Sequence, residues 1–325
     1  MMLAFRAAVG LLAAAALFGA PQPAPAPGAL DPALLRHVPA DSRVLAGIDM
    51  ARLASSASGR ALFSLLQASY PRLAALNKWP GFDPLRDARQ ILVSAAGQAS
   101  ANHTVILVRG SFDLAAMQAQ GLRLEIFENA PVLRPAGKEA PWAAILEDDV
   151  AALGSQESLQ RLLVRRNSAG KPDAGLLARA RELSGRYDFW AVSIAPSADL
   201  AAAVPEGQWS GILRGDVLAA VQESRLGIEA GDSNRLIAEA VLRTAKDAAA
   251  LAEVVRFFAG VLQLTEKIRG SKVPPAAGLL DGLQVQTEGN LMRATFVLSG
   301  AQLQTLVRRA RDLDLLNATP PPTAP

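Results

Sequence analysis

The sequence predicts an α+β protein of antiparallel sheets covered by helices on one face, and three observations lead to that fold class. Half of the chain is hydrophobic and 19% is charged, which provides enough apolar surface for a packed core. Alternating apolar and polar residues recur in pairs joined by short turns, as hairpin strands do. A helical pattern that begins with Ser or Thr follows each pair. We therefore expect repeated strand–turn–strand–helix units, arranged as two related halves.

The N-terminus has the layout of an export signal. Arg6 precedes an apolar stretch that ends at Ala20, too short to cross a bilayer, and prolines then follow at every second position from Pro21 to Pro27. We predict a signal peptide over residues 1–20, with its cleavage point left open, and an extended Pro/Ala-rich spacer over residues 21–37. The protein is thus expected in the periplasm or outside the cell, with no transmembrane anchor after signal removal.

The first α+β half is predicted over residues 38–195. Its elements in chain order are a strand over 43–48, a helix over 59–69, strands over 91–93 and 104–108, a helix from Ser111, strands over 142–146 and 150–153, a helix capped by Ser155, a helix through Leu176 to Leu183 and a strand over 189–194.

The second half is predicted over residues 196–315, before a disordered tail over residues 316–325. Its elements are a strand over 225–228, a strand over 236–242, a helix from Thr244, a strand over 283–287, a turn at Gly289-Asn290, a strand over 291–298 and a helix opened by Ser299 with Gln302 as a capping box. Residues 236–242 also fit a helical spacing. The pattern leaves open whether the two halves share one continuous sheet.

Short motifs carry a resemblance to a known group of proteins. Val38-Pro39-Ala40-Asp41-Ser42 stands before a strand that ends in Ile48-Asp49, and residues 81–87 and 109–113 flank a hairpin. Together with the Leu153-Gly154-Ser155 junction, these motifs resemble a family of exported bacterial proteins of unknown function with duplicated hairpin–helix halves. The likeness covers residues 38 to about 311. It implies a fold and an exported location, and it implies no activity.

Composition excludes several classes of chemistry. The chain has no cysteine, which excludes disulfides, thiol catalysis and cysteine-ligated metals. The net charge is +3, aromatic residues are 5% of the chain, and the basic residues are scattered. A nucleic-acid binder would instead gather Lys and Arg on one face with aromatic residues between them. We therefore expect no nucleic acid as partner.

The histidine content argues against familiar hydrolase sites. His37 and His103 are the two histidines, they form no His-x-x-x-His pair, and no Gly-x-Ser-x-Gly elbow occurs. Serine-hydrolase chemistry needs a base beside its nucleophile, and a zinc site needs several clustered ligands. We assign no catalytic residue, no cofactor-binding residue, no metal ligand and no cofactor.

Carboxylates are the candidates that the sequence leaves open. Glu147-Asp148-Asp149 could ligate a hard cation, but Asp residues also favour tight turns, and we prefer the turn. Asp83, Asp87 and Glu147 could in principle supply a carboxylate pair for glycoside cleavage. Asp83 before Pro84 fits a helix N-cap better.

Other singled-out residues have a structural interpretation that we prefer to a functional one. The tryptophans are expected to pack in the core rather than to bind sugars, the arginines to lie at helix C-termini rather than on lipid or cell-wall polymers, and the sequons to be chance occurrences. These residues are Trp79, Trp142, Trp190, Trp209; Arg161, Arg165, Arg166, Arg308, Arg309, Arg311; Asn102 and Asn317.

The leading hypothesis is an exported, non-enzymatic protein that binds an unknown envelope or extracellular partner. A secreted hydrolase with an unfamiliar carboxylate site and a carrier of an apolar ligand are the alternatives. A deep pocket with converging carboxylates would favour the hydrolase, a lipid-sized apolar cavity the carrier, and a flat polar sheet face the binding protein.

Overall fold

The computed structural model of the protein describes residues 29–79, 81–96, 104–119, 122–134, 141–165, 170–195, 216–269 and 282–303. Its strands are β1 (Val44–Asp49), β2 (Ala88–Ala95), β3 (Thr104–Gly110), β4 (Arg123–Phe127), β5 (Ala130–Arg134), β6 (Trp142–Glu147), β7 (Val150–Gly154), β8 (Phe189–Ser193), β9 (Val221–Glu229), β10 (Ser233–Leu242), β11 (Gln284–Glu288) and β12 (Leu291–Ser299). Its helices are α2 (Pro32–Leu35), α3 (Met50–Ala54), α4 (Ala57–Ser69), α5 (Pro71–Ala74), the 3₁₀ turn η1 (Ala75–Lys78), α6 (Pro84–Asp87), α7 (Leu114–Ala119), α8 (Gln156–Arg165), α9 (Ala174–Ser184), α12 (Asp216–Ala219) and α13 (Ala245–Arg269).

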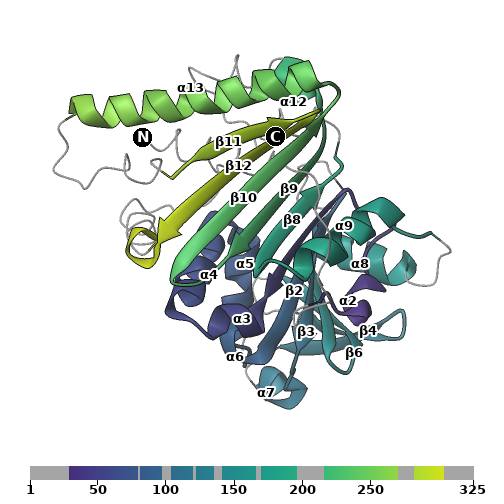
Figure 1. The fold of residues 1–325 in the computed structure, drawn as a ribbon. Coiled ribbons are helices and arrows are strands. Elements are labelled where there is room, and N and C mark those ends of the chain that lie inside the picture. Colours follow the sequence, from purple (N-terminus) through teal and green to yellow (C-terminus); the bar gives the residue numbers. More distant parts are fainter. Residues whose placement is uncertain are drawn as a thin grey trace.

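All the described strands form a single antiparallel sheet, in the order β11-β12-β10-β9-β8-β1-β2-β3-β7-β6-β5-β4 (Figure 1). The α+β class and the antiparallel pairing predicted from sequence are confirmed. The predicted halves, residues 38–195 and 196–315, meet at β8 and β9, which pair directly from Phe189↔Ile228 to Ser193↔Ser224. One continuous sheet therefore runs through the molecule.

The strand order is similar on the two sides of the β1–β8 pair. Outward from β1 it runs β1-β2-β3-β7-β6, and outward from β8 it runs β8-β9-β10-β12-β11. On each side a hairpin follows the central strand, β2–β3 after β1 and β9–β10 after β8. The second strand of a later hairpin, β7 or β12, then pairs with the outer strand of that first hairpin. The β4–β5 hairpin extends the sheet on the β1 side alone.

Helices cover both faces at the centre of the sheet, so the expected single covered face is wrong there. Leu45, Leu92 and Leu107 pack against α2, α8 and α9 on one face. Ile48 and Ile91, with their neighbours on β3, pack against α3, α4 and α7 on the other. The central strands are apolar in both side-chain registers, as Thr104-Val-Ile-Leu-Val108 illustrates, and such runs suit strands buried on both faces.

The outer strands β10, β12 and β11 have α13 packed on one face. Small residues, including Ala238, Ala240 and Ala294, form that contact with Ala248 and Leu251 of the helix. Alanine on both sides lets a long helix approach the sheet closely. None of the helices within the described ranges combines the length and apolar character needed to cross a membrane.

Several local predictions are confirmed at atomic detail. Residues 236–242 lie in strand β10, which resolves the choice between strand and helix. The Ser299 amide donates to Gln302 Oε1 at 2.7 Å and the Gln302 amide to Ser299 Oγ at 3.2 Å, which are the two bonds of a capping box. Thr244 Oγ1 accepts from the Asp247 amide at 3.1 Å and so caps α13. The helix predicted from Ser111 instead begins at Leu114, where Asp113 accepts from the Ala116 amide at 2.9 Å.

Several short elements were not predicted, namely α3, α5, η1 and α12, and two further omissions concern α2 and the β4–β5 hairpin. Residues 30–37, assigned above to the extended spacer, contain the helix α2 instead, with Leu34 fully buried in the core. Asp31 caps α2 and Pro32 stands in its first turn, the same Asp-Pro signal that was recognised at Asp83. The hairpin β4–β5 was also missed, because its turn lacks glycine and Pro131 disfavours a strand.

Candidate functional site

The acidic residues at the β6–β7 turn are engaged in ion pairs. Glu147 accepts from Arg36 at 3.0 Å and lies 2.9 Å from Nε2 of His37, both at the end of α2. Asp148 and Asp149 form the two-residue turn between the strands, so the turn interpretation is confirmed. His37 is thus a contact between α2 and this turn.

Asp149 belongs to a network that continues across the sheet end. Arg109 on β3 lies 2.6 Å from Asp149 and 3.2 Å from Asp31, and Arg89 on β2 lies 2.8 Å from Asp149. Each carboxylate is therefore balanced by arginine. Within the described ranges, no group of three or more His, Asp or Glu side chains gathers as metal ligands would.

Asp83 and Asp87 serve helix α6. Asp83 Oδ1 accepts from the Leu85 amide at 3.0 Å, and Asp87 Oδ2 accepts from the Asp83 amide at 2.8 Å. Hydrogen bonds from Arg86 lower the pKa of the Asp87 carboxyl and raise that of the guanidinium. The predicted N-cap is confirmed. Asp83 and Glu147 serve separate local structures, α6 and the β6–β7 turn.

Tryptophans pack as predicted where the structure describes them. Trp79 is buried edge-on against Phe82, which stacks on Phe112. Trp142 is half-buried under the guanidinium of Arg134, 5.3 Å from the ring centroid. Trp190 is buried and lies opposite Gly47 on β1, where a Cβ atom would stand 2.3 Å from its ring. Gly47 therefore leaves the room that the indole fills.

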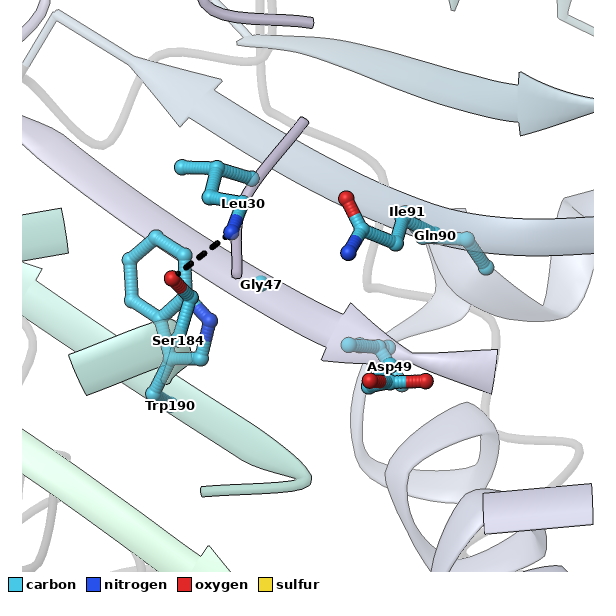
Figure 2. Close-up of a pocket in the computed structure, with 8 residues that line it drawn as sticks. Leu30, Gly47, Asp49, Gln90, Ile91, Ser184 and Trp190 are labelled. Atoms are coloured by element: carbon cyan, nitrogen blue, oxygen red, sulfur yellow. Dashed lines mark hydrogen bonds between the residues drawn. The ribbon is translucent and has the colours of Figure 1, made fainter. Parts of the chain in front are cut away.

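The hollow beside Trp190 is very small (Figure 2). Its volume is about 10 Å³, the room of a single water molecule. Leu30 closes it, and its amide donates to Ser184 Oγ at 3.0 Å. Asp49 and Gln90 supply the polar part of the lining. The site offers no space for an organic ligand.

A second hollow is much larger and lies on the hairpin β11–β12. Its volume is about 330 Å³, and it is lined by Gln286, Thr287, Glu288, Leu291 and Arg293. This volume is in the range of small-molecule sites, but four of the five lining residues are polar and the hollow is open to solvent. It marks the sheet face opposite α13 as the candidate site.

The face of these strands on which no described helix packs, called here the polar face, is built from cross-strand rows of side chains on β10, β12 and β11. Alternate residues point to opposite faces of a sheet, and Ala240, Met292 and Val285 point toward α13. Their neighbours therefore form the polar face. Its rows are Gln284–Thr295–Ile237, Gln286–Arg293–Glu239 and Glu288–Leu291–Val241, with Val297–Arg235 beyond them.

Charge on the polar face is partly paired. Arg293 donates to Glu239 Oε1 at 2.7 Å, in the middle row. Gln284, Gln286, Glu288 and Arg235 are exposed, while Ile237, Val241 and Leu291 stand in the rows of the same face and are buried. The face thus presents amides and both signs of charge beside apolar side chains, a composition suited to hydrogen bonding with a polar partner.

A buried arginine lies where this face meets helix α9. The Arg225 side chain on β9 is 3% exposed, lies 3.1 Å from Glu223 and 3.8 Å from Glu182 of α9. Burial lowers the pKa of the Arg225 guanidinium. Arg179 of α9 reaches Glu223 at 3.6 Å. These pairs bind the helix to the sheet and form the border of the polar face.

The remaining sequence candidates divide into two groups. Arg161 pairs with Glu157 at 2.8 Å, and Arg165 with Asp41 at 2.9 Å. The others lie outside the described residues: His103, Asn102, Arg166, Trp209, Arg308, Arg309, Arg311, Asn317, the predicted signal peptide of residues 1–20 and the predicted tail of residues 316–325.

Comparison with known proteins shows similarity of fold. No protein-family model matches the chain, and no curated protein matches it in sequence. A solved structure of TP0453, crystal form I, is similar with a TM-score of 0.52 at 11% identity, covering 85% of this chain and 97% of that one. The likeness extends over most of both chains and concerns the fold alone.

Proposed function

We propose that the protein is exported and acts without catalysis, by binding an envelope or extracellular partner at the polar face of β10, β12 and β11. The observation that carries the proposal is this face, with its three exposed polar side chains on β11 and its hollow of about 330 Å³. Export rests on the residues from Arg6 to the proline run, which have the pattern of a signal peptide and spacer.

The two alternatives receive less support. The hydrolase hypothesis needs free carboxylates, whereas Glu147 and Asp149 are each bound to basic side chains. The carrier hypothesis needs an enclosed apolar cavity, whereas the hollow beside Trp190 holds about 10 Å³ and the larger one is open to solvent and has one apolar residue, Leu291, in its lining. Neither alternative is favoured by a specific contact.

We further propose that the two sides of the sheet descend from one repeated unit, with β8 belonging to the second unit rather than to the predicted first half of residues 38–195. The support is the shared strand order, β1-β2-β3-β7-β6 against β8-β9-β10-β12-β11, with β4–β5 as an addition to one side. On the β1 side both sheet faces are buried, and on the β8 side the corresponding strands keep one face for binding. Duplication followed by loss of one helical layer would produce this difference.

The binding proposal is tested by capture from intact envelope. The protein is used as bait beside a variant with Gln284, Gln286 and Glu288 changed to alanine. A matched control changes Gln156, Glu157 and Gln160, exposed on α8, to alanine. We expect capture by the parent and the control, with at least about a tenfold loss in the β11 variant.

Two results would overturn the binding proposal: equal capture by all three proteins, or no capture together with turnover in a hydrolase screen. Export is tested separately, by cell fractionation of the full chain and of a chain lacking residues 1–20. Retention of both inside the cell would contradict the exported location.

A further inference from the structure

The other edge of the sheet carries a feature that the polar face does not explain. β4 is the last strand in the sheet order, and its two apolar side chains of one register, Leu124 and Ile126, are 41% and 68% exposed. They extend the apolar row that begins with the buried Leu122, on the face that carries α7. An exposed apolar edge strand is a template for pairing with another strand.

The β4–β5 turn determines which backbone groups face the open edge. Glu128 and Asn129 form a two-residue turn with φ of 47° and 59°, and Phe127 pairs with Ala130 across it. The pair that flanks such a turn exchanges both hydrogen bonds, and bonded and non-bonded pairs then alternate. Leu124 and Ile126 therefore direct their N–H and C=O groups away from β5. Within the described residues, β4 has β5 as its one neighbour in the sheet.

We infer that β4 pairs antiparallel with β4 of a second copy of this chain, with Leu124 opposite Leu124. This inference goes beyond the proposed function, and it rests on different residues. A two-fold axis through the central pair would join two sheets edge to edge. The interface is isologous, so it closes as a dimer and does not propagate.

Charge complementarity selects this register. With Leu124 on the axis, Arg123 of each copy lies opposite Glu125 of the other, which makes two ion pairs on one face of the ribbon. Ile126 lies beside Leu122 of the second copy on the other face. Like the central leucine pair, this contact is apolar on both sides.

Two neighbouring registers would also let the backbone N–H and C=O groups of Leu124 and Ile126 bond to the second copy, but their side-chain pairs are less favourable. With Glu125 on the axis, two carboxylates stand opposite each other, which is destabilising. With Ile126 on the axis, Glu125 lies opposite Phe127 and Arg123 opposite Asn129, so neither charge faces an opposite charge of the second copy, and Glu125 keeps the ion pair with Arg134 of its own chain at 3.5 Å. The sequence Arg-Leu-Glu-Ile-Phe is thus self-complementary in one register.

Sedimentation equilibrium of the full chain tests the dimer. We expect a monomer–dimer equilibrium that Ile126→Lys weakens by at least about tenfold, because the lysine would place a charge beside the apolar Leu122 of the second copy. Val164→Lys is the matched control, since Val164 is 56% exposed on α8. A parent that is monomeric at every concentration, or an Ile126→Lys variant that associates like the parent, would overturn the inference.

Exchange of charges tests the register. Arg123→Glu should weaken the dimer about tenfold, and Arg123→Glu combined with Glu125→Arg should restore it. Within one chain Arg123 lies opposite Arg134, so the single variant removes a like-charge pair and is not expected to harm folding. Failure of the double variant to restore association would exclude this register.

Cross-linking gives a third readout, because the chain has no cysteine of its own. Leu124→Cys should form a disulfide-linked dimer, since the Cα atoms of a hydrogen-bonded pair stand about 5.5 Å apart. Ile126→Cys should not, because the two cysteines would lie roughly 14 Å apart along the ribbon. The reverse result, or a monomeric chain whose β4 edge captures an extended peptide of another protein, would overturn the inference.

Discussion

β4 and β11 are the two outermost strands of the same sheet, and each is the first strand of a two-residue hairpin. At β11 the outward carbonyl of Val285 accepts from Nη2 of Arg256 on α13 at 2.9 Å. At β4 the side chains beside the outward backbone groups are apolar and exposed. Within the described residues, a side chain of α13 thus contacts the outer edge of β11, while β4 has β5 as its one neighbour in the sheet.

The difference shows that an edge is protected by what packs beside it rather than by its hairpin. Arg256 donates to the outward carbonyl of Val285, so a further strand would have to displace this contact in order to add to β11. The turn before β12 is held as well, because Asn290 Nδ2 donates to the Leu242 carbonyl at 2.8 Å. We therefore expect binding at the face of the β11 side and strand pairing at the edge of the β4 side.

The largest difference in stability between the two sides of the sheet is expected from truncating an apolar side chain that packs α13 on the sheet. Leu251→Ala removes a side chain that is 3% exposed between α13 and the sheet, and should lower the free energy of unfolding by about 3 kcal/mol. Ile126→Ala at the open edge should change it by less than about 0.5 kcal/mol. Denaturant unfolding at protein concentrations low enough for monomers measures both. Equal losses would mean that the two edges are equally covered.

A smaller and opposite pair of effects is expected at the two turns. Gly289 has a φ of 57°, so Gly289→Ala should destabilise the protein by about 1 kcal/mol. Glu128 has a φ of 47° with a side chain present, so Glu128→Gly should stabilise it by about 0.5 kcal/mol. Thermal unfolding of the two variants gives the signs. A loss at Glu128→Gly would show that its side chain stabilises the turn by more than the backbone strain costs.

The smallest effect on stability is expected from Arg256→Ala. The Val285 carbonyl would then bond to water, so the free energy of unfolding should fall by about 0.5 kcal/mol or less. Amide hydrogen exchange should speed up in β11 and stay unchanged in β4, which locates the effect. Faster exchange spread over the whole sheet would argue that Arg256 acts on global stability instead.

Local patterns predicted much of the fold. Alternation identified the strands around Gly289-Asn290, and the serine–glutamine spacing identified the capping box whose two bonds are formed. Asp83 before Pro84 predicts a helix cap, which the structure forms. The same signal at Asp31 and Pro32 lies in the segment predicted as an extended spacer, where it caps α2. The β4–β5 hairpin lacked a recognisable signal, since Glu128 and Asn129 adopt positive φ without glycine.

The candidate sites were predicted less well than the elements that carry them. The alternation at residues 283–287 placed Gln284 and Gln286 on one face of a strand, but it did not show which face a helix would cover. Conversely, Glu147 and Asp149 stood out in sequence, and their partners Arg36, Arg89 and Arg109 come from three different elements. Partners so distant in sequence leave no local pattern.

The sequence by itself determined the α+β class, most strands and the helix caps, because periodicity and capping depend on residues a few positions apart. The tertiary structure decided that the predicted halves join at β8 and β9 and that helices cover both faces at the centre. It also decided that, among the described residues, no helix packs on one face of the outer strands and no strand pairs with the outer edge of β4. These features depend on contacts between elements that are separate in the sequence, such as that of Gly47 and Trp190, whose fit arises only when β1 and β8 pair.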